Sequence, residues 1–389
     1  LEAPIQAFGV AGLVVLVVSA LLTAGYLLPV VTEGFFPGRD FITERREVGV
    51  QMTWPMIAFA AAVVLMGLLP GGLLHWLGLL AARMFPLHPG SFEKGGTSVR
   101  QFLTLPILVP IVLGIALLIL QPKSRRVRSI YIMAASLATT ALSLACIVLT
   151  YLYGSGFLAC IMVRFNEAFS ISLRIDGASM VYGAIVSVLW PLVTAYSLDY
   201  MSHEGHENRF FAFWLMAYGV VLGIAYSEDF LTLYFFYEVL TLTTLPLVMH
   251  AMDEKARYAG RKYLVYSLSG AAFAFIGIVF LLNYGVGHLN FTYGVILDQC
   301  LAAGNERTLE LVFVAAFFGF GVKAAVFPFH GWLPDAPGAT TPVSALLHAV
   351  AVVKAGAFAV LRLIYYGFGA DFLRGSWAQT VVMTAAIVT

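Results

Sequence analysis

The chain has 389 residues, of which 60% are hydrophobic and only 11% charged, and its mean hydropathy is +0.89. This composition excludes a soluble globular protein and indicates a membrane protein. The net charge of +1 gives no basic patch, which argues against a nucleic-acid partner. The cysteines Cys146, Cys160 and Cys300 are too scattered to form a metal-binding or redox motif.

Apolar stretches of the length that a membrane helix needs recur along the whole chain. They predict an all-α polytopic membrane protein with about 11 transmembrane helices. The expected spans are residues 8–31, 52–77, 102–120, 130–153, 177–196, 210–227, 230–252, 263–284, 311–327, 342–366 and 377–389.

Residues 157–174 interrupt this pattern, because their apolar and polar side chains alternate more like those of strands than of a helix. Asn166 and Glu167 provide a turn in the middle of the stretch. We therefore expect a short β-hairpin between two membrane spans.

Lysine and arginine gather in two short loops, residues 121–129 and 253–262. An even number of expected spans separates these loops, so both can lie on one side of the membrane. By the positive-inside rule, that side is the cytoplasm.

A Gly- and Pro-rich stretch at residues 85–97 resembles a linker and predicts a boundary between segments 1–94 and 95–389. The first segment holds two expected helices, and the second holds the ionisable residues of interest. The chain does not begin with Met and stops inside an apolar run, so we expect it to be a fragment of a longer protein.

Residues 318–362 combine an apolar composition with charged side chains and prolines. A charge at membrane depth costs about 2.5–3.5 kcal/mol on insertion scales, so such residues usually mark an ion or substrate path. Prolines free backbone groups, which is tolerated there only beside protein or a water-filled cavity. The stretch therefore predicts a broken helix and a route for ions. Its ionisable residues are Lys323, His330, Asp335, His348 and Lys354, and its prolines are Pro328, Pro334, Pro337 and Pro342.

Glu238 lies well inside the expected span 230–252. Such a carboxylate is either neutralised and bonded to a neighbouring helix, or kept charged by a nearby lysine. Lys323 and Lys354 are the matching cations, and Lys354 is too deep in its span to reach the interface comfortably. We expect these three residues to carry protons.

Other candidates have a structural alternative. His348 can extend a proton path or form a hydrogen bond in the core. Asp229 fits the start of its span, where the helix dipole favours a carboxylate. The residues at the break form either a gate or a capped turn: Pro328, His330, Trp332 and Asp335.

Two segments carry a family resemblance: FFYEVLTLTTLPL, residues 235–247, and VKAAVFPFHGWLPDAPGATTPVSALLHAVAVVKAG, residues 322–356. They resemble the antiporter-like, proton-translocating subunits of respiratory complex I, of Mrp-type cation/proton antiporters and of membrane-bound hydrogenases. By this resemblance, Glu238, Lys323 and Lys354 correspond to the glutamate of the fifth helix and the lysines of the seventh and eighth. His330 corresponds to the histidine of the break.

Two positions depart from the family pattern. Tyr237 stands where a tryptophan often precedes the glutamate. His348 stands where one branch carries a histidine and lacks the lysine, whereas this chain also has Lys354. The branch of the family therefore stays open.

The resemblance implies part of an inverted-repeat antiporter-like fold, in a subunit that moves protons, with sodium as an alternative or exchanged ion. It implies other membrane subunits as partners, a prokaryotic inner membrane as the location, and no cofactor or metal bound by this chain. A redox reaction, if one drives the transport, belongs to another subunit of an NADH dehydrogenase-like or hydrogenase-like complex. Segment 1–94 resembles the last two helices of one such subunit, and segment 95–389 resembles the beginning of a second.

Two other functions fit the residues. A stand-alone secondary transporter of a small solute also uses broken helices. A purely structural membrane scaffold would tolerate neutral residues at Lys323 and Lys354.

Overall fold

The computed structural model describes residues 18, 50–68, 100–165, 170–291, 295–335 and 340–389. The described part is almost entirely helical, and seven of its helices are long and apolar enough to cross a membrane. These are residues 102–120, 125–153, 177–203, 207–225, 230–248, 254–284 and 341–368. The chain is therefore an integral, polytopic membrane protein, as its composition predicts.

The observed helices follow the predicted spans closely. In chain order they are α2 (Val50–Leu68), η1 (Phe102–Thr104), α5 (Leu105–Leu120), α6 (Arg125–Tyr153), α7 (Gly177–Tyr200), η2 (Met201–His203), α8 (Glu207–Ala225), α9 (Phe230–Val248), α10 (Glu254–Tyr284), α11 (Gln299–Ala302), α12 (Glu306–Gly321), α13 (Thr341–Val343), η5 (Ser344–Val352), α14 (Val353–Arg362), η6 (Leu363–Phe368), α15 (Ala370–Leu373) and α16 (Trp377–Val388). The predicted span 8–31, the end of span 52–77 and the boundary near residue 94 lie outside the described residues.

Aspartates fix where three of the long helices begin. Asp176, Asp229 and Asp253 precede α7, α9 and α10, and each accepts a hydrogen bond from a backbone N–H of the first turn. These bonds satisfy donors that a helix leaves free at its N-terminus.

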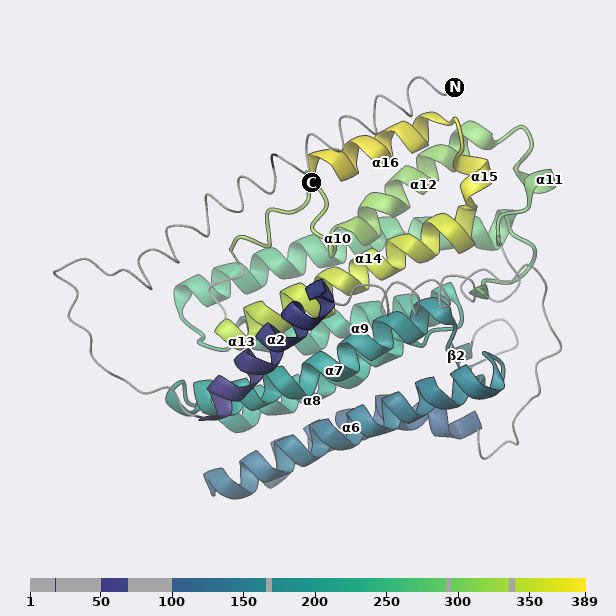
Figure 1. Ribbon diagram of the computed structural model, residues 1–389. Helices are drawn as coiled ribbons and strands as arrows, with labels where there is room; N and C mark the ends of the chain where they lie inside the picture. The colour runs from purple at the N-terminus through teal and green to yellow at the C-terminus, as the bar shows by residue number, and fades with distance from the viewer. Residues whose placement is uncertain (1–17, 19–49, 69–99, 166–169, 292–294, 336–339) are drawn as a thin grey trace.

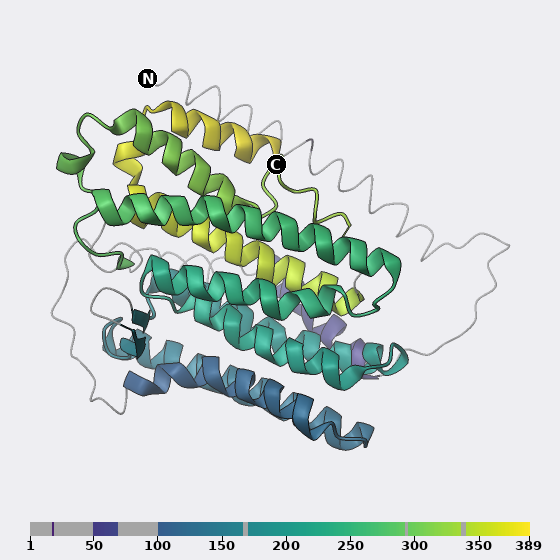
Figure 2. The ribbon, with the colours of Figure 1, turned by 180° about the vertical axis from the view of Figure 1, so that it is seen from behind.

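The helices pack side by side in a layered bundle, with α6 at one edge and α16 at the other (Figures 1 and 2). Helix α8 lies inside and is packed against α5, α7 and α9. Two glycines allow the close approach of α5 and α8. A Cβ on Gly219 would lie 2.3 Å from the carbonyl oxygen of Ile107, and one on Gly114 would lie 2.6 Å from that of Ala212. Small residues at such contacts are typical of membrane helices.

The two basic loops lie at the same end of the bundle, as the spacing of the spans predicts. Arg128 at the start of α6 pairs with Glu207 at the start of α8, at 2.5 Å. Arg209 on α8 donates to the carbonyl of His250, just after α9, at 2.7 Å. These contacts join the start of α6 and the end of α9, next to the two loops, to the first turn of α8.

The predicted hairpin is present at the opposite end. Strands β1 (Cys160–Arg164) and β2 (Ser170–Leu173) are antiparallel, with Cys160 opposite Leu173 and Arg164 opposite Ser170. The expected turn residues, Asn166 and Glu167, lie outside the described residues.

The predicted broken helix is also observed. Helix α12 ends at Gly321, turns follow through residue 335, and helical structure resumes at Thr341. The expected span 311–327 was therefore too long at its C-terminal end. Pro328 lacks a backbone N–H and disfavours helical conformation in the residue before it, so the chain leaves the helix well ahead of the proline.

A buried ion pair connects the last long span to α7. Arg362 is 1% exposed, and its two terminal nitrogens bind the carboxylate of Asp176 at 2.5 and 2.8 Å. The guanidinium also lies 4.6 Å from the ring centre of Phe291 and 4.7 Å from that of Tyr366. The same carboxylate caps α7, so this pair fixes the ends of both helices.

Replacing Arg362 with Gln should destabilise the protein by about 2–4 kcal/mol, because it leaves the Asp176 carboxylate, whose side chain is only 22% exposed, without its cation. Thermal or denaturant-induced unfolding of the purified protein in detergent measures the effect. Arg374→Gln is the matched control, since Arg374 pairs with Asp371 on the surface with 75% of its side chain exposed. It should change stability by less than about 1 kcal/mol. Equal losses of stability in the two variants would show that the Arg362–Asp176 pair stabilises the protein no more than the surface pair does.

Candidate functional site

Lys323 is the most deeply buried cation of the described residues. It follows the end of α12, and its side chain is 0% exposed. Its ammonium donates a hydrogen bond to the backbone carbonyl of Tyr237 on α9 and lies 3.5 Å from the centre of the Tyr237 ring. A carbonyl dipole and an aromatic face thus replace part of the water that this ammonium loses on burial.

Glu238 is the next residue of α9 and interacts electrostatically with Lys323. Its side chain is partly buried, and its Oε1 atom has no hydrogen-bond partner within the part of the chain that the structure describes. The structure therefore brings the predicted carboxylate and lysine together. The direct contact of Lys323 is nevertheless the Tyr237 carbonyl, which leaves a carboxylate oxygen of Glu238 available to a proton or a water molecule.

Tyr237 connects the two helices of this site. Its hydroxyl donates to the carbonyl of Phe320 in the last turn of α12 at 3.1 Å, and its ring meets the Phe320 ring edge to face. Sequence reasoning treated Tyr237 only as a substitute for tryptophan. No local pattern could have shown that its ring, carbonyl and hydroxyl all contact the Lys323 segment.

The residues after Lys323 are anchored by Trp332. This side chain is buried, its Nε1 donates to the carbonyl of Val322 at 2.8 Å, and its ring packs on Tyr263 of α10. The Tyr263 hydroxyl in turn bonds to Thr244 of α9 at 2.8 Å. Trp332 thus adds a side-chain donor to a carbonyl at the end of α12, which also accepts from the backbone N–H of Ala325 at 3.1 Å.

Asp335 forms an ion pair with Lys262 of α10. The two side chains are 38% and 27% exposed, so this contact lies near the surface of the bundle. It links the segment between α12 and α13 to the end of the bundle that carries the basic loops. The sequence offered a gate or a backbone-capped turn for Asp335, and neither reading included Lys262.

The other predicted relay residues do not share the buried environment of Lys323. His330 is exposed and stacks on Phe327. Lys354 is exposed on α14. The backbone of His348 belongs to the π-helical segment η5, and its side chain lies outside the described part.

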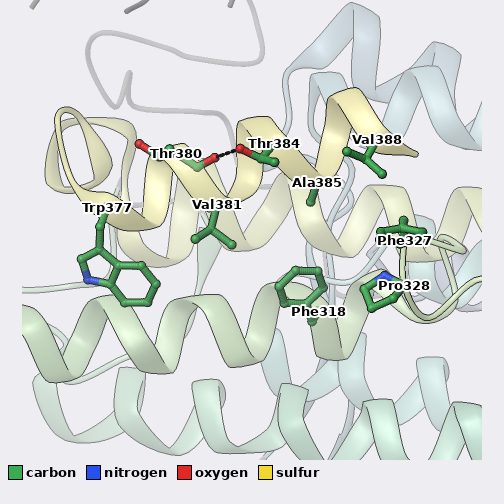
Figure 3. Close-up of a pocket in the computed structure, with 9 residues that line it drawn as sticks. All are labelled: Phe318, Phe327, Pro328, Trp377, Thr380, Val381, Thr384, Ala385 and Val388. Carbon is green, nitrogen blue, oxygen red and sulfur yellow. Dashed lines mark hydrogen bonds between the residues drawn. The ribbon is translucent and has the colours of Figure 1, made fainter. Parts of the chain in front are cut away.

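Pro328 lies at the edge of an apolar groove of about 550 Å³ between α12, the break and α16. Figure 3 shows Phe318 of α12 facing Val381 and Ala385 of α16, with Pro328 at one end. This lining holds no ionisable side chain, so the groove is separate from the Glu238 and Lys323 site.

Asp229 is the N-cap residue of α9. One carboxylate oxygen accepts from the backbone N–H of Thr232 at 2.7 Å, and the other accepts from the hydroxyls of Ser172 and Thr232. Burial raises the pKa of this carboxyl, and these hydrogen bonds oppose part of the increase. The arrangement joins β2 to α9 and is a structural one.

Comparisons with known proteins agree with this geometry. Residues 227–389 match the family model described as NADH:quinone oxidoreductase/Mrp antiporter, TM. Residues 165–211 match the model described as NADH-Ubiquinone oxidoreductase (complex I), chain 5 N-terminus. These two matches assign residues 165–211 and 227–389 to this family of antiporter-like membrane subunits.

Two relatives belong to cation/proton antiporters. The chain is 35% identical over 196 residues to an Na(+)/H(+) antiporter subunit of Alkalihalophilus pseudofirmus. This match covers 50% of this chain and 24% of the relative. It is 33% identical over 198 residues to a probable K(+)/H(+) antiporter subunit of Rhizobium meliloti, covering 50% of this chain and 19% of the relative. The match thus spans about a quarter or less of each relative's length.

A solved structure shows the same fold. The membrane-bound sulfane sulfur reductase (MBS), an archaeal respiratory membrane complex, contains a chain that superimposes with a TM-score of 0.59 at 20% sequence identity. The superposition covers 72% of this chain and 55% of the other.

Tyr237→Phe tests the connection between α9 and α12. The variant keeps the aromatic face above Lys323 but removes the hydroxyl bond to Phe320, so stability should fall by about 1–3 kcal/mol. Unfolding in detergent measures the change. Tyr258→Phe is the control, because Tyr258 is 59% exposed and its hydroxyl can turn to water. The connection would be disproved if the two variants unfolded alike.

Proposed function

We propose that this chain translocates protons across a prokaryotic cell membrane, in exchange for a monovalent cation, as one member of a multi-subunit complex. The observation that carries the proposal is the buried Lys323 ammonium beside the Glu238 carboxylate. Ionisable residues inside a membrane bundle are costly and commonly form proton relays or ion paths. The named antiporter relatives and the bacterial organisms they come from support the exchange and the location.

The geometry suggests how the pair works. With Glu238 ionised, the carboxylate and the Tyr237 carbonyl stabilise the charged ammonium of Lys323. A proton that arrives at the free Oε1 atom of Glu238 removes the negative charge and weakens this stabilisation. Lys323 then releases its own proton more readily, because a desolvated ammonium without a counter-charge is unstable.

The relay predicted from the sequence continues beyond Lys323 through His330, His348 and Lys354, and it remains a proposal. His330 and Lys354 are exposed in the described structure. We also propose that segments 1–94 and 95–389 are parts of two consecutive antiporter-like units. A second glutamate and broken-helix set upstream in the full-length protein would support that arrangement.

Glu238→Gln should lower cation-driven proton transport at least about tenfold, a change of about 1.4 kcal/mol or more in the transport barrier. The complete complex, reconstituted in vesicles with a pH-sensitive dye, provides the measurement, and co-purification of the partner proteins checks assembly. Glu254→Gln is the control, since Glu254 is exposed in the first turn of α10. Unchanged transport in Glu238→Gln vesicles would refute the proposal. Transport by vesicles that contain only this polypeptide would instead favour a stand-alone transporter.

A further inference from the structure

Thr241 lies three residues after Glu238 on α9, and its hydroxyl lacks the bond that a threonine usually makes inside a helix. The residue is 1% exposed, and its Oγ1 atom has no hydrogen-bond partner among the residues that the structure describes. Buried polar groups are rarely left without a partner, so this one needs an explanation. The contacts of the neighbouring Lys323 ammonium provide it.

A threonine inside a helix can donate to the backbone carbonyl four residues earlier. Thr194 and Thr244 do so in this chain, each at 2.7 Å. For Thr241 the corresponding carbonyl is that of Tyr237. This carbonyl is the group that accepts a hydrogen bond from Lys323.

The Tyr237 carbonyl oxygen has two lone pairs, and both are in use. One accepts the backbone N–H of Thr241, as the geometry of an α-helix requires, and the other accepts from the Lys323 ammonium. The Thr241 hydroxyl therefore competes with Lys323 for one acceptor. Because the ammonium occupies this acceptor, the hydroxyl is left without a partner.

Glu238 offers the same hydroxyl a second acceptor. Residues three apart on a helix are neighbours and side chains lean toward the helix N-terminus, so Thr241 leans toward Glu238. The Oε1 atom of Glu238 is also buried and without a partner within the described part of the chain. The Tyr263 hydroxyl of α10 interacts with Thr241 as well, but its hydrogen bond goes to Thr244, at 2.8 Å. Two acceptors of the proton site thus lie within about one helical turn of the Thr241 hydroxyl.

We propose that Thr241 is a positioning residue of the proton site. Its hydroxyl donates to the Glu238 carboxylate while Lys323 is charged, and to the Tyr237 carbonyl once Lys323 is neutral. A threonine in a helix has two accessible rotamers, so the change requires no movement of the backbone. The hydroxyl keeps its own proton throughout and only turns. This inference rests on the proposed function, because it assigns a third residue to the same site.

The alternation links the protonation of Glu238 to that of Lys323. While the charged ammonium holds the Tyr237 carbonyl, the Thr241 hydroxyl stabilises the ionised carboxylate through a charge-assisted bond. A proton that binds Glu238 removes this charge and weakens the bond. Lys323 then releases its proton and becomes a weaker donor, so the hydroxyl replaces it at the carbonyl. The buried acceptors are thus satisfied in both states, which lowers the cost of passing between them.

Thr241→Val tests the proposal, because it removes the hydroxyl and nearly keeps the shape of the side chain. In the complete complex reconstituted in vesicles, it should lower cation-driven proton transport about tenfold, the effect of losing one hydrogen bond to a charged group. Thr241→Ser restores the hydroxyl and should therefore restore transport.

Thr243→Val is the matched control. Thr243 is 9% exposed, and its hydroxyl bonds to its own helix at the carbonyls of Val239 and Leu240. This variant should keep the full transport rate. Thr241→Val should unfold in detergent at no lower temperature than the control, so that a difference in transport between them is not a difference in folding.

Infrared spectroscopy of the purified complex provides a readout that does not depend on transport. The carboxylate band of Glu238 is assigned by its loss in Glu238→Gln. It should shift in Thr241→Val, because the carboxylate loses a donor, and stay in place in Thr243→Val.

The outcomes distinguish this inference from the proposed function. Normal transport in Glu238→Gln would refute the proposed function. With that variant inactive, an unchanged carboxylate band or an unchanged transport rate in Thr241→Val would overturn only the role of Thr241. Equal losses of transport in Thr241→Val and Thr241→Ser would overturn it as well, because the hydroxyl would then not be the group that matters.

Discussion

The burial of the Lys323 ammonium is the constraint on which the rest of the site depends. Removing such an ion from water costs several kcal/mol even after relaxation, and the cost must be offset locally. Three partners lie next to it, namely the carbonyl of Tyr237, the ring of the same residue, and the Glu238 carboxylate. Two of these partners, the carbonyl and the ring, belong to Tyr237 of α9. The end of α12, which carries Lys323, therefore has to pack closely against α9.

The helix break lies directly beside this buried ammonium. Lys323 follows the last turn of α12, and its side chain is fully buried. Ending a helix inside the membrane frees carbonyl groups, which must find donors. Tyr237 donates to Phe320 and Trp332 donates to Val322, so the aromatic residues around the site also complete the backbone hydrogen bonding.

The spans, the hairpin and the break could be predicted because each follows from a local pattern in the sequence: an apolar stretch, an alternation of polar and apolar residues, or a group of prolines. The sequence indicated that Glu238 and Lys323 could lie close together only because their charges are opposite. It did not indicate that Tyr237 would contact Lys323. The Arg362–Asp176 pair was missed because its partners are 186 residues apart and each resembles an ordinary span end. Lys262 was counted as a loop charge, so its bond to Asp335 was also not foreseen. Pairing between helices depends on the packing of the whole bundle, which no local pattern contains.

The surroundings of Lys323 and of the Ser187 carbonyl on α7 follow from one physical condition, applied at two places. In water, a carbonyl released by a proline or a helix end would bond to solvent, with little effect on its neighbours. Inside a bilayer it must be satisfied by protein, and the groups that satisfy it are then concentrated at one depth. At the break these groups are aromatic donors that surround an ammonium. At Pro191 they are hydroxyls: Thr140 and Tyr218 approach the carbonyl oxygen of Ser187, which the proline leaves without its helical donor. The first arrangement suits a residue that carries a proton, and the second joins α6 and α8 to α7.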